Sequence, residues 1–216
     1  MEQARPTGDS MRLRRRFATL RRGVLLLPAL LPVLILVPLL TAPPALADSA
    51  RLRDATGDMF TVEEGATTGV AAPDARIGDM VRVRFRHTRD RVVVRARFVE
   101  LRPVGRRFTL WVDMRAPGGR RTTLGVQARR DDRQGHVILM DAHGGDLTCT
   151  VRHRIDYSRD VVTAVVPRSC LGDPASLRFS VLSEQWGRRL HFANLDDGHT
   201  ATAPGPLHWT GPVRAG

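Results

Sequence analysis

Residues 146–184 read DLTCTVRHRIDYSRDVVTAVVPRSCLGDPASLRFSVLSE and hold both cysteines of the chain. Before the polar turn Asp156–Asp160, apolar and polar side chains alternate with the period of two that a β-strand imposes. Val161–Val166 is rich in β-branched residues, which suit a covered strand. Pro167 ends this strand because proline donates no ladder hydrogen bond. A further strand begins at Leu177, so the stretch predicts β-structure throughout.

The two cysteines, Cys149 and Cys170, predict one disulfide, because an even cysteine count in an exported chain is typical of a bridged domain. The bridge would join the far end of the hairpin's first strand to the corner CLGDP that follows its second strand. Closing a loop of about 20 residues contributes roughly 3 kcal/mol to the free energy of unfolding, mostly by restricting the unfolded chain.

Residues 1–47 have the features of a signal peptide. Arginines cluster between Arg12 and Arg22, an apolar run follows from Gly23 to Leu40, and small residues end the segment at Ala45-Leu46-Ala47. We predict cleavage after Ala47, no membrane span in the remaining chain, and a secreted, extracellular protein. Two points stay open. The chain starts at Met1 or at Met11, and it is exported by the general or by the twin-arginine route.

All 34 basic residues are arginine, against 22 acidic residues, and the formal net charge is +12 at pH 7. Such a basic surface favours anionic partners. The absence of lysine, together with many Ala, Gly, Val and Pro residues, is also typical of the codon usage of a GC-rich bacterial genome. The number of arginines is therefore a weak argument for a particular ligand.

Three regions follow the predicted signal peptide. Residues 48–79 are polar and rich in glycine, and we predict an N-terminal loop region with one short edge strand near Met59–Val62. Residues 80–195 carry the regular strand pattern and form the predicted β-sandwich core. Residues 196–216 are rich in glycine and proline and are predicted to be a C-terminal tail.

Within residues 80–195, short strand patterns recur at regular spacing. Apolar residues alternate with arginines in VRVRF (81–85), and the segment 92–98 repeats this alternation after a turn, which predicts a hairpin. Further strands are predicted at Phe108–Met114, Leu124–Ala128, Val137–Met140 and Leu190–Ala193. Roughly eight to ten short strands with no amphipathic helix predict an all-β fold, an antiparallel β-sandwich of jelly-roll type.

The segments DATGD (54–58), IGDMVRVRFRHTRDRVVVRARF (77–98) and VVPRSCLGDP (165–174) carry a resemblance. Together they resemble a family of secreted bacterial proteins whose domain is similar to family-9 carbohydrate-binding modules and to DOMON domains. The resemblance implies a β-sandwich over the whole chain after the signal peptide. Neither the sugar-binding aromatic residues nor the haem ligands of those domains have matching positions here.

Arginines on the predicted hairpin point to one outer face. They are Arg82, Arg84 and Arg86 on its first strand and Arg95 and Arg97 on its second. One interpretation is a platform for a polysaccharide or an anionic cell-wall polymer; nucleic acid has the same charge but is not an expected partner of an exported protein. The alternative is a solvated face neutralised by Glu100, Asp113 and Asp160.

Four aspartates precede the first hairpin: Asp54, Asp58, Asp74 and Asp79. Carboxylate oxygens in a glycine-containing loop are ligands that Ca²⁺ prefers, so calcium is the one cofactor that the sequence suggests. The spacing is not that of an EF-hand. The alternative is that these residues cap turns and strand ends.

Trp111 lies on the polar face of its predicted strand, a position from which an indole ring can stack on a sugar. The alternative is that a loop or the second sheet covers this face.

The sequence contains no GxSxG, P-loop, GxGxxG or HExxH motif. The closest approach to a metal motif, Asp141, His143 and His153, flanks a turn and is interpreted as structural. We therefore expect a secreted, non-catalytic module that binds a polysaccharide or anionic cell-surface polymer. Two alternatives stay open: an extracellular hydrolase using Asp113, Asp141 and the N-terminal aspartates, and a structural envelope protein. The oligomeric state is also open.

Overall fold

The computed structural model describes residues 48–66, 68–187, 191–198 and 208–216. All of them lie in the unit Ala42–Gly216. The predicted signal peptide, residues 1–47, lies outside the described residues. Within the described ranges, no helix is long and apolar enough to cross a membrane.

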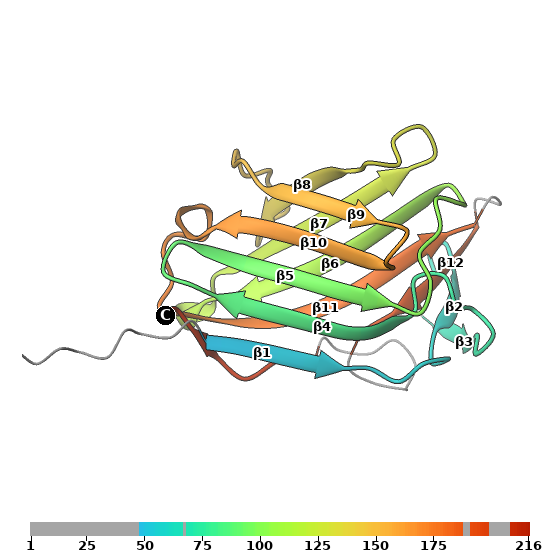
Figure 1. The fold of residues 1–216 in the computed structure, drawn as a ribbon, viewed down its shortest axis with the longest axis horizontal. Helices are drawn as coiled ribbons and strands as arrows, with labels where there is room; N and C mark the ends of the chain where they lie inside the picture. The colour runs from blue at the N-terminus through green and yellow to red at the C-terminus, as the bar shows by residue number, and fades with distance from the viewer. Residues whose placement is uncertain (1–47, 67, 188–190, 199–207) are drawn as a thin grey trace, which may run out of the picture. The chain divides into compact units, whose positions relative to one another are not determined.

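The first sheet, sheet A, has five antiparallel strands (Figure 1). In spatial order they are β1 (Asp48–Arg53), β4 (Met80–His87), β5 (Arg91–Phe98), β10 (Val161–Pro167) and β9 (Arg152–Asp156). β4 and β5 form the hairpin that the alternating arginines predict. β9 and β10 form the hairpin predicted around residues 156–160, and β10 pairs with β5 to join the two hairpins.

The second sheet, sheet B, is also antiparallel. In spatial order its strands are β3 (Gly69–Ala71), β2 (Phe60–Glu63), β12 (Phe192–Asp196), β11 (Ser176–Trp186), β6 (Arg107–Arg115), β7 (Arg121–Arg129) and β8 (His136–Asp141). A short strand, β13 (Val213–Arg214), pairs with the start of β11. Two short 3-10 helices, η1 (Pro117–Gly119) and η2 (Arg168–Leu171), follow β6 and β10.

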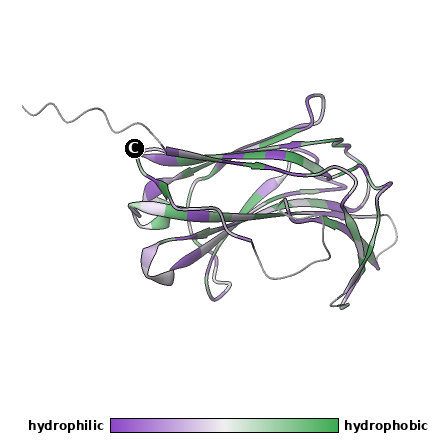
Figure 2. Ribbon diagram, turned by 90° about the horizontal axis from the view of Figure 1, so that it is seen from below, coloured by the Kyte–Doolittle hydropathy of each residue, from purple (hydrophilic) through white to green (hydrophobic). Residues whose placement is uncertain are grey.

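The two sheets face each other across one hydrophobic core. Phe85 of sheet A stacks on Phe179 of sheet B, with ring centroids 4.4 Å apart, and Phe98 meets Phe108 edge-on at 5.6 Å. Apolar and polar residues alternate along the strands, as the green and purple segments of Figure 2 show. Because a strand turns alternate residues to opposite faces, one face of each sheet is buried and the other lies outside. The predicted all-β, antiparallel sandwich is confirmed.

The predicted disulfide is also present. Cys149, just before β9, is bonded to Cys170 of η2, and the two Cα atoms are 6.0 Å apart. Both cysteines are partly buried against the hydrophobic core. The strand that we predicted to start at Cys149 begins only at Arg152, so the bridge holds the segment that leads into β9.

Residues 48–79 are not the loop region that we predicted, because they contain β1, β2 and β3. β1 pairs with β4 along its whole length. Ala50 and Leu52 pack against the core while Arg51 and Arg53 are exposed. An alternation that includes only two apolar residues is a weak sequence signal for a strand. The segment is a strand because it pairs with β4. β2 confirms the short strand near Met59–Val62, but β3 covers its edge.

Residues 196–216 are likewise not merely a tail. Thr210 donates its backbone N–H to the carbonyl of Phe179, and its hydroxyl accepts the Phe179 N–H. Val213 in β13 is almost fully buried. The last long strand lies at Phe192–Asp196 rather than Leu190–Ala193, of which residue 190 falls outside the described ranges. The C-terminal segment therefore completes sheet B beside β11.

Candidate functional site

Nine exposed arginines on the outer surface of sheet A form a group that we call the arginine face. They are Arg51 and Arg53 on β1, Arg82, Arg84 and Arg86 on β4, Arg95 and Arg97 on β5, and Arg152 and Arg154 on β9. A tenth, Arg91 at the start of β5, follows Asp90, whose pKa it lowers, and is not counted in the group. Arg84 lies directly opposite Arg51 on one side and Arg95 on the other, and the neighbouring row repeats this arrangement. The five arginines predicted from the sequence thus share one face, and β1 and β9 add four more.

The arginine face contains little negative charge. Among the described residues, its only ion pair joins Arg154 to Asp156, at 3.1 Å. The other eight arginines of the face make no side-chain hydrogen bond or ion pair within the described part of the chain. Side chains directly opposite in an antiparallel pair are about 5 Å apart, within one Debye length at physiological salt, so these guanidinium groups repel one another.

The acidic residues that could have neutralised this face bind other partners. Glu100 forms an ion pair with Arg102. Asp113 lies on sheet B, where it forms an ion pair with Arg121 at 2.8 Å. Asp160 accepts a backbone N–H with its Oδ1, at 2.8 Å. None of these three carboxylates forms an ion pair with an arginine of the arginine face within the described part of the chain.

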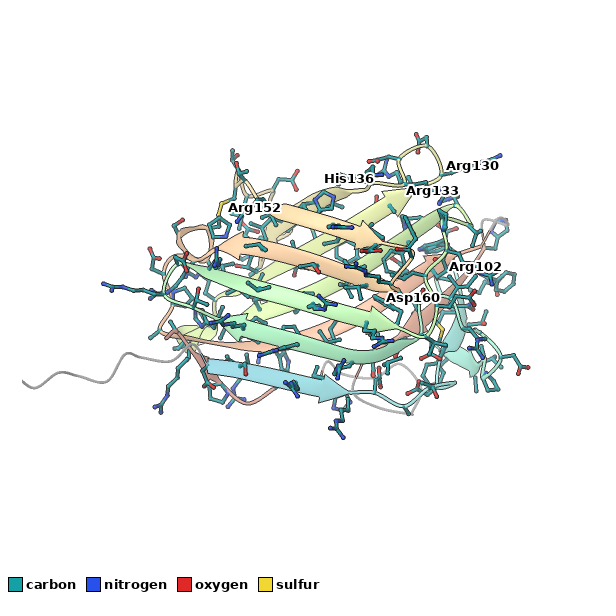
Figure 3. The ribbon with its side chains drawn as sticks, viewed as in Figure 1. Arg102, Arg130, Arg133, His136, Arg152 and Asp160 are labelled. Atoms are coloured by element: carbon teal, nitrogen blue, oxygen red, sulfur yellow. A yellow bond between two sulfur atoms is a disulfide. The ribbon has the colours of Figure 1, made fainter. Side chains whose placement is uncertain are left out.

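A hollow of about 440 Å³ opens on the arginine face. It is lined by Arg51, Arg82, Arg84, Arg95, Arg97, Arg159 and Val161. Figure 3 looks onto this sheet, with Arg152 labelled on β9. A guanidinium group presents a planar fork of N–H donors that matches carboxylate and phosphate oxygens. The hollow thus combines positive charge with donors suited to anions.

Trp111 does not join the arginine face, because it lies on the outer surface of sheet B. Its ring covers Gly125, directly opposite on β7; a Cβ atom at Gly125 would lie 2.6 Å from the indole Cζ3. The indole N–H donates to Glu184 Oε2 at 3.2 Å. The side chain is half-buried, and the sugar-stacking position predicted at Trp111 is separated from the arginines by the whole core.

A second group of functional side chains lies at one end of the sandwich; we call it the carboxylate cluster. It consists of Asp54 after β1, Asp58 before β2, Asp79 before β4 and Asp196 at the end of β12. One oxygen from each of Asp54, Asp58 and Asp196 lies within 4.8 Å of the other two. Asp79 adjoins them, because its Oδ2 accepts the backbone N–H of Gly57 at 2.9 Å.

Burial raises the pKa of all four carboxyl groups of the cluster above the ordinary range. The negative charge of Asp196 raises the pKa of Asp54 further, and the charge of Asp79 does the same for Asp58. The backbone N–H groups of Met80 and Gly198, which donate to Asp196, act in the opposite direction. The cluster thus crowds carboxyl groups in a place that water reaches poorly, which disfavours their charged form.

The structure brings together only part of the predicted calcium ligands. Asp54 and Asp58 meet, and Asp79 adjoins them, but Asp74 is exposed and lines a different hollow beside Arg76. Asp196 is the member of the cluster that sequence reasoning missed, because it falls in the predicted tail. The run Asp196-Asp197-Gly198 at a strand end was the available signal, since Asp and Gly favour such turns.

Of the carboxylates predicted for a hydrolase, Asp54, Asp58 and Asp79 lie in this cluster, whereas Asp113 and Asp141 do not. Asp113 accepts hydrogen bonds from Arg121 Nε at 2.9 Å and Thr123 Oγ1 at 2.6 Å. Asp141 accepts the backbone N–H groups of Gly145 and His143, which lower its pKa. Both side chains are thus engaged in local contacts of their own strands and turns.

In comparisons with protein families, with curated proteins and with solved structures, nothing matches this chain.

Proposed function

We propose that this protein is an exported, non-catalytic β-sandwich module that binds an anionic polymer of the cell surface, such as an acidic polysaccharide, through the arginine face. The observation that carries the proposal is the set of eight exposed arginines that have no carboxylate partner among the described residues. Export is supported by the signal-like residues 1–47 and by the disulfide, which suits an oxidising compartment.

The dimensions of the arginine face favour a polymer over a small anion. Its arginines extend from β1 to β9, across five strands spaced about 4.8 Å apart, which is a width of about 20 Å. A small anion would contact two or three guanidinium groups and leave the remaining repulsion in place. A chain of negative charges can contact several rows at once and releases its condensed counterions when it binds.

Catalysis is not part of the proposal. Glycoside hydrolysis uses two free carboxyl groups on either side of the scissile bond. Asp113 and Asp141, two of the carboxylates of the hydrolase alternative, are held by an arginine and by backbone amides instead. The N-terminal aspartates of that alternative, Asp54, Asp58 and Asp79, lie in the carboxylate cluster, and Asp74 lies apart from it. The exposed apolar side chains of Val70, Val104 and Phe192 belong to different segments, so a structural envelope role has no specific support from them.

The test is retention of the exported, purified protein on heparin, a sulfated polysaccharide used as the probe, at several salt concentrations. The wild type should bind with an affinity that falls steeply as salt rises, because each phosphate-like contact releases a counterion. The double variant R84Q/R95Q removes two central arginines. It should elute at lower salt and reduce the slope of log K against log salt by about 1 for each arginine.

A matched control separates a site from a general effect of net charge. R130Q/R178Q removes two exposed arginines away from the arginine face and changes the net charge by the same amount. This control should elute close to the wild type. If R84Q/R95Q and R130Q/R178Q elute at the same salt concentration, binding follows net charge alone and the proposed function is wrong.

A further inference from the structure

The carboxylate cluster contains buried oxygens that have no hydrogen-bond partner among the described residues. Eight buried side-chain atoms lack a hydrogen-bond partner in the described part of the chain, and four of them are oxygens of this cluster. They are Asp54 Oδ2, both oxygens of Asp58, and Asp79 Oδ1. A buried polar atom without a partner costs free energy, and a buried charge without a counter-charge costs more.

Asp79 is the strongest single indication of a missing partner. The residue is only 1 % exposed, yet Oδ1 has no hydrogen-bond partner among the described residues. Its other oxygen, Oδ2, accepts the N–H of Gly57, in the loop that carries Asp54 and Asp58. Asp79 is thus a fully buried carboxyl group beside the cluster, with one oxygen that lacks a partner.

The nearby positive charge is insufficient. Among the described residues, Arg76 lowers the pKa of Asp79, but no arginine acts in this way on Asp54, Asp58 or Asp196. Backbone N–H groups donate to both oxygens of Asp196, from Met80 to Oδ2 and from Gly198 to Oδ1, but to only one oxygen of Asp79. Four neighbouring carboxylates would therefore remain mutually repelling unless protons or a cation joined them.

We infer that Asp54, Asp58 and Asp196 form a binding site for one Ca²⁺ ion, and that the Asp79 carboxyl group beside them adds negative charge to the site. Among the described residues, the available donors are all carboxylate oxygens, which hard cations prefer, and the group includes no cysteine or histidine. Oxygens that surround a Ca²⁺ ion at about 2.4 Å lie at most about 4.8 Å apart, which the three grouped oxygens satisfy. Mg²⁺ demands near-octahedral geometry and is reluctant to lose water, so a buried site rich in carboxylates favours Ca²⁺.

The ion would join segments that are distant in sequence. Asp54 and Asp58 belong to the connection between β1 and β2, Asp79 precedes β4, and Asp196 ends β12. A bound Ca²⁺ ion would thus connect sheet A and sheet B at one end of the sandwich. Because the ion binds the folded state and not the unfolded chain, Ca²⁺ should raise Tm by mass action.

The test uses the exported protein after treatment with EDTA and adds CaCl₂ alone. Calorimetric titration should show saturable binding of one ion per chain. At a Ca²⁺ concentration about 100 times Kd, Tm should rise by about 5–10 °C. An unchanged Tm together with no heat of binding in the wild type overturns the inference without any variant, as does an equal response to MgCl₂.

Two matched variants identify the ligands. D58N alters a half-buried ligand and should abolish the calcium-dependent rise in Tm, whereas D74N, the exposed aspartate outside the cluster, should keep the full rise. In EDTA, D58N should melt no lower than the wild type, because the change removes one like charge from the cluster. A full rise in D58N, or a lost rise in D74N, overturns the assignment. Polyanion binding at the arginine face is measured separately, so either proposal can fail alone.

Discussion

At the scale of single residues, His87 shows how a titratable group becomes part of a hydrophobic core. Its side chain is fully buried at the end of β4, with Nδ1 3.0 Å from the carbonyl oxygen of Val213. Among the described residues, Nε2 is buried without a hydrogen-bond partner. Burial lowers the pKa of His87 below its ordinary 6.5, the Val213 hydrogen bond opposes this, and the charge of Arg168 lowers it further. The folded protein therefore favours the neutral ring more than the unfolded chain does.

This depressed pKa predicts a loss of stability in mild acid. The unfolded chain takes up a proton at His87 below about pH 6.5, whereas the folded protein takes it up only at lower pH, so the free energy of unfolding falls as pH drops below that value. The slope is at most one proton, or about 1.4 kcal/mol per pH unit. Urea unfolding at pH 7.5 and pH 5.5 should show a smaller difference for H87Q than for the wild type.

H143Q, which changes an exposed histidine, is the control and should leave the difference between the two pH values unchanged. An H87Q protein with the wild-type difference would mean that His87 is protonated in the folded state.

At the scale of elements, the corner after β10 fastens one edge of sheet A. β9 is an edge strand that pairs only with β10 in this sheet. The disulfide ties the segment before β9 to η2, and the Arg168 guanidinium binds the carbonyl oxygens of Arg89, Asp173 and Pro174. The disulfide and these hydrogen bonds thus stabilise the region beside β9, whose other edge pairs with no strand of sheet A.

The disulfide prediction follows from this arrangement. C149A/C170A should lower the free energy of unfolding by about 3 kcal/mol, mainly because the unfolded chain gains freedom over a separation of 21 residues. Urea unfolding of the variant and the wild type measures this difference. Thiol titration of the unfolded, unreduced wild type should find no free sulfhydryl, and two reactive thiols would contradict the bridge.

At the scale of the whole sandwich, the arginines on the two outer faces differ in the partners that they contact. On sheet B, Arg107 lies over the ring of Trp186 at 4.9 Å and pairs with Glu184 at 3.3 Å, and Arg115 lies over Trp209 at 4.4 Å. On sheet A, eight of the nine arginines of the arginine face have no such partner among the described residues. Rings and carboxylates compensate the charge on one face only, so repulsion is concentrated on the other.

This asymmetry predicts that added salt stabilises the protein. NaCl screens repulsion between exposed charges, so Tm should rise between about 20 mM and 500 mM salt. R84Q/R95Q should melt higher than the wild type at low salt, because it removes directly opposed like charges, and its Tm should depend less on salt. Calorimetric melting at both salt concentrations tests this, with R130Q/R178Q as the charge-matched control. Equal salt dependence in the two double variants would contradict repulsion within the arginine face.

The amino-acid sequence determined the parts of the protein that depend on local order. A strand pattern is visible within a single segment, so the β4–β5 and β9–β10 hairpins could be predicted from the sequence. The outward direction of the five arginines on β4 and β5 followed from the same pattern. Two cysteines permit one pairing, so the disulfide also followed. Asp54 and Asp58 could be proposed as ligands together because they lie in one loop.

Contacts between distant segments decided the rest. Asp196 reaches the N–H of Met80, 116 positions away, because β12 pairs with β2 and β11, and no local pattern encodes that pairing. β1 became a strand, and Arg51 joined the arginine face, only through its register with β4. Trp111 and the arginines were separated because their strands belong to different sheets. Strand partners are chosen by burial of a shared core, which is a property of the folded chain rather than of any one segment.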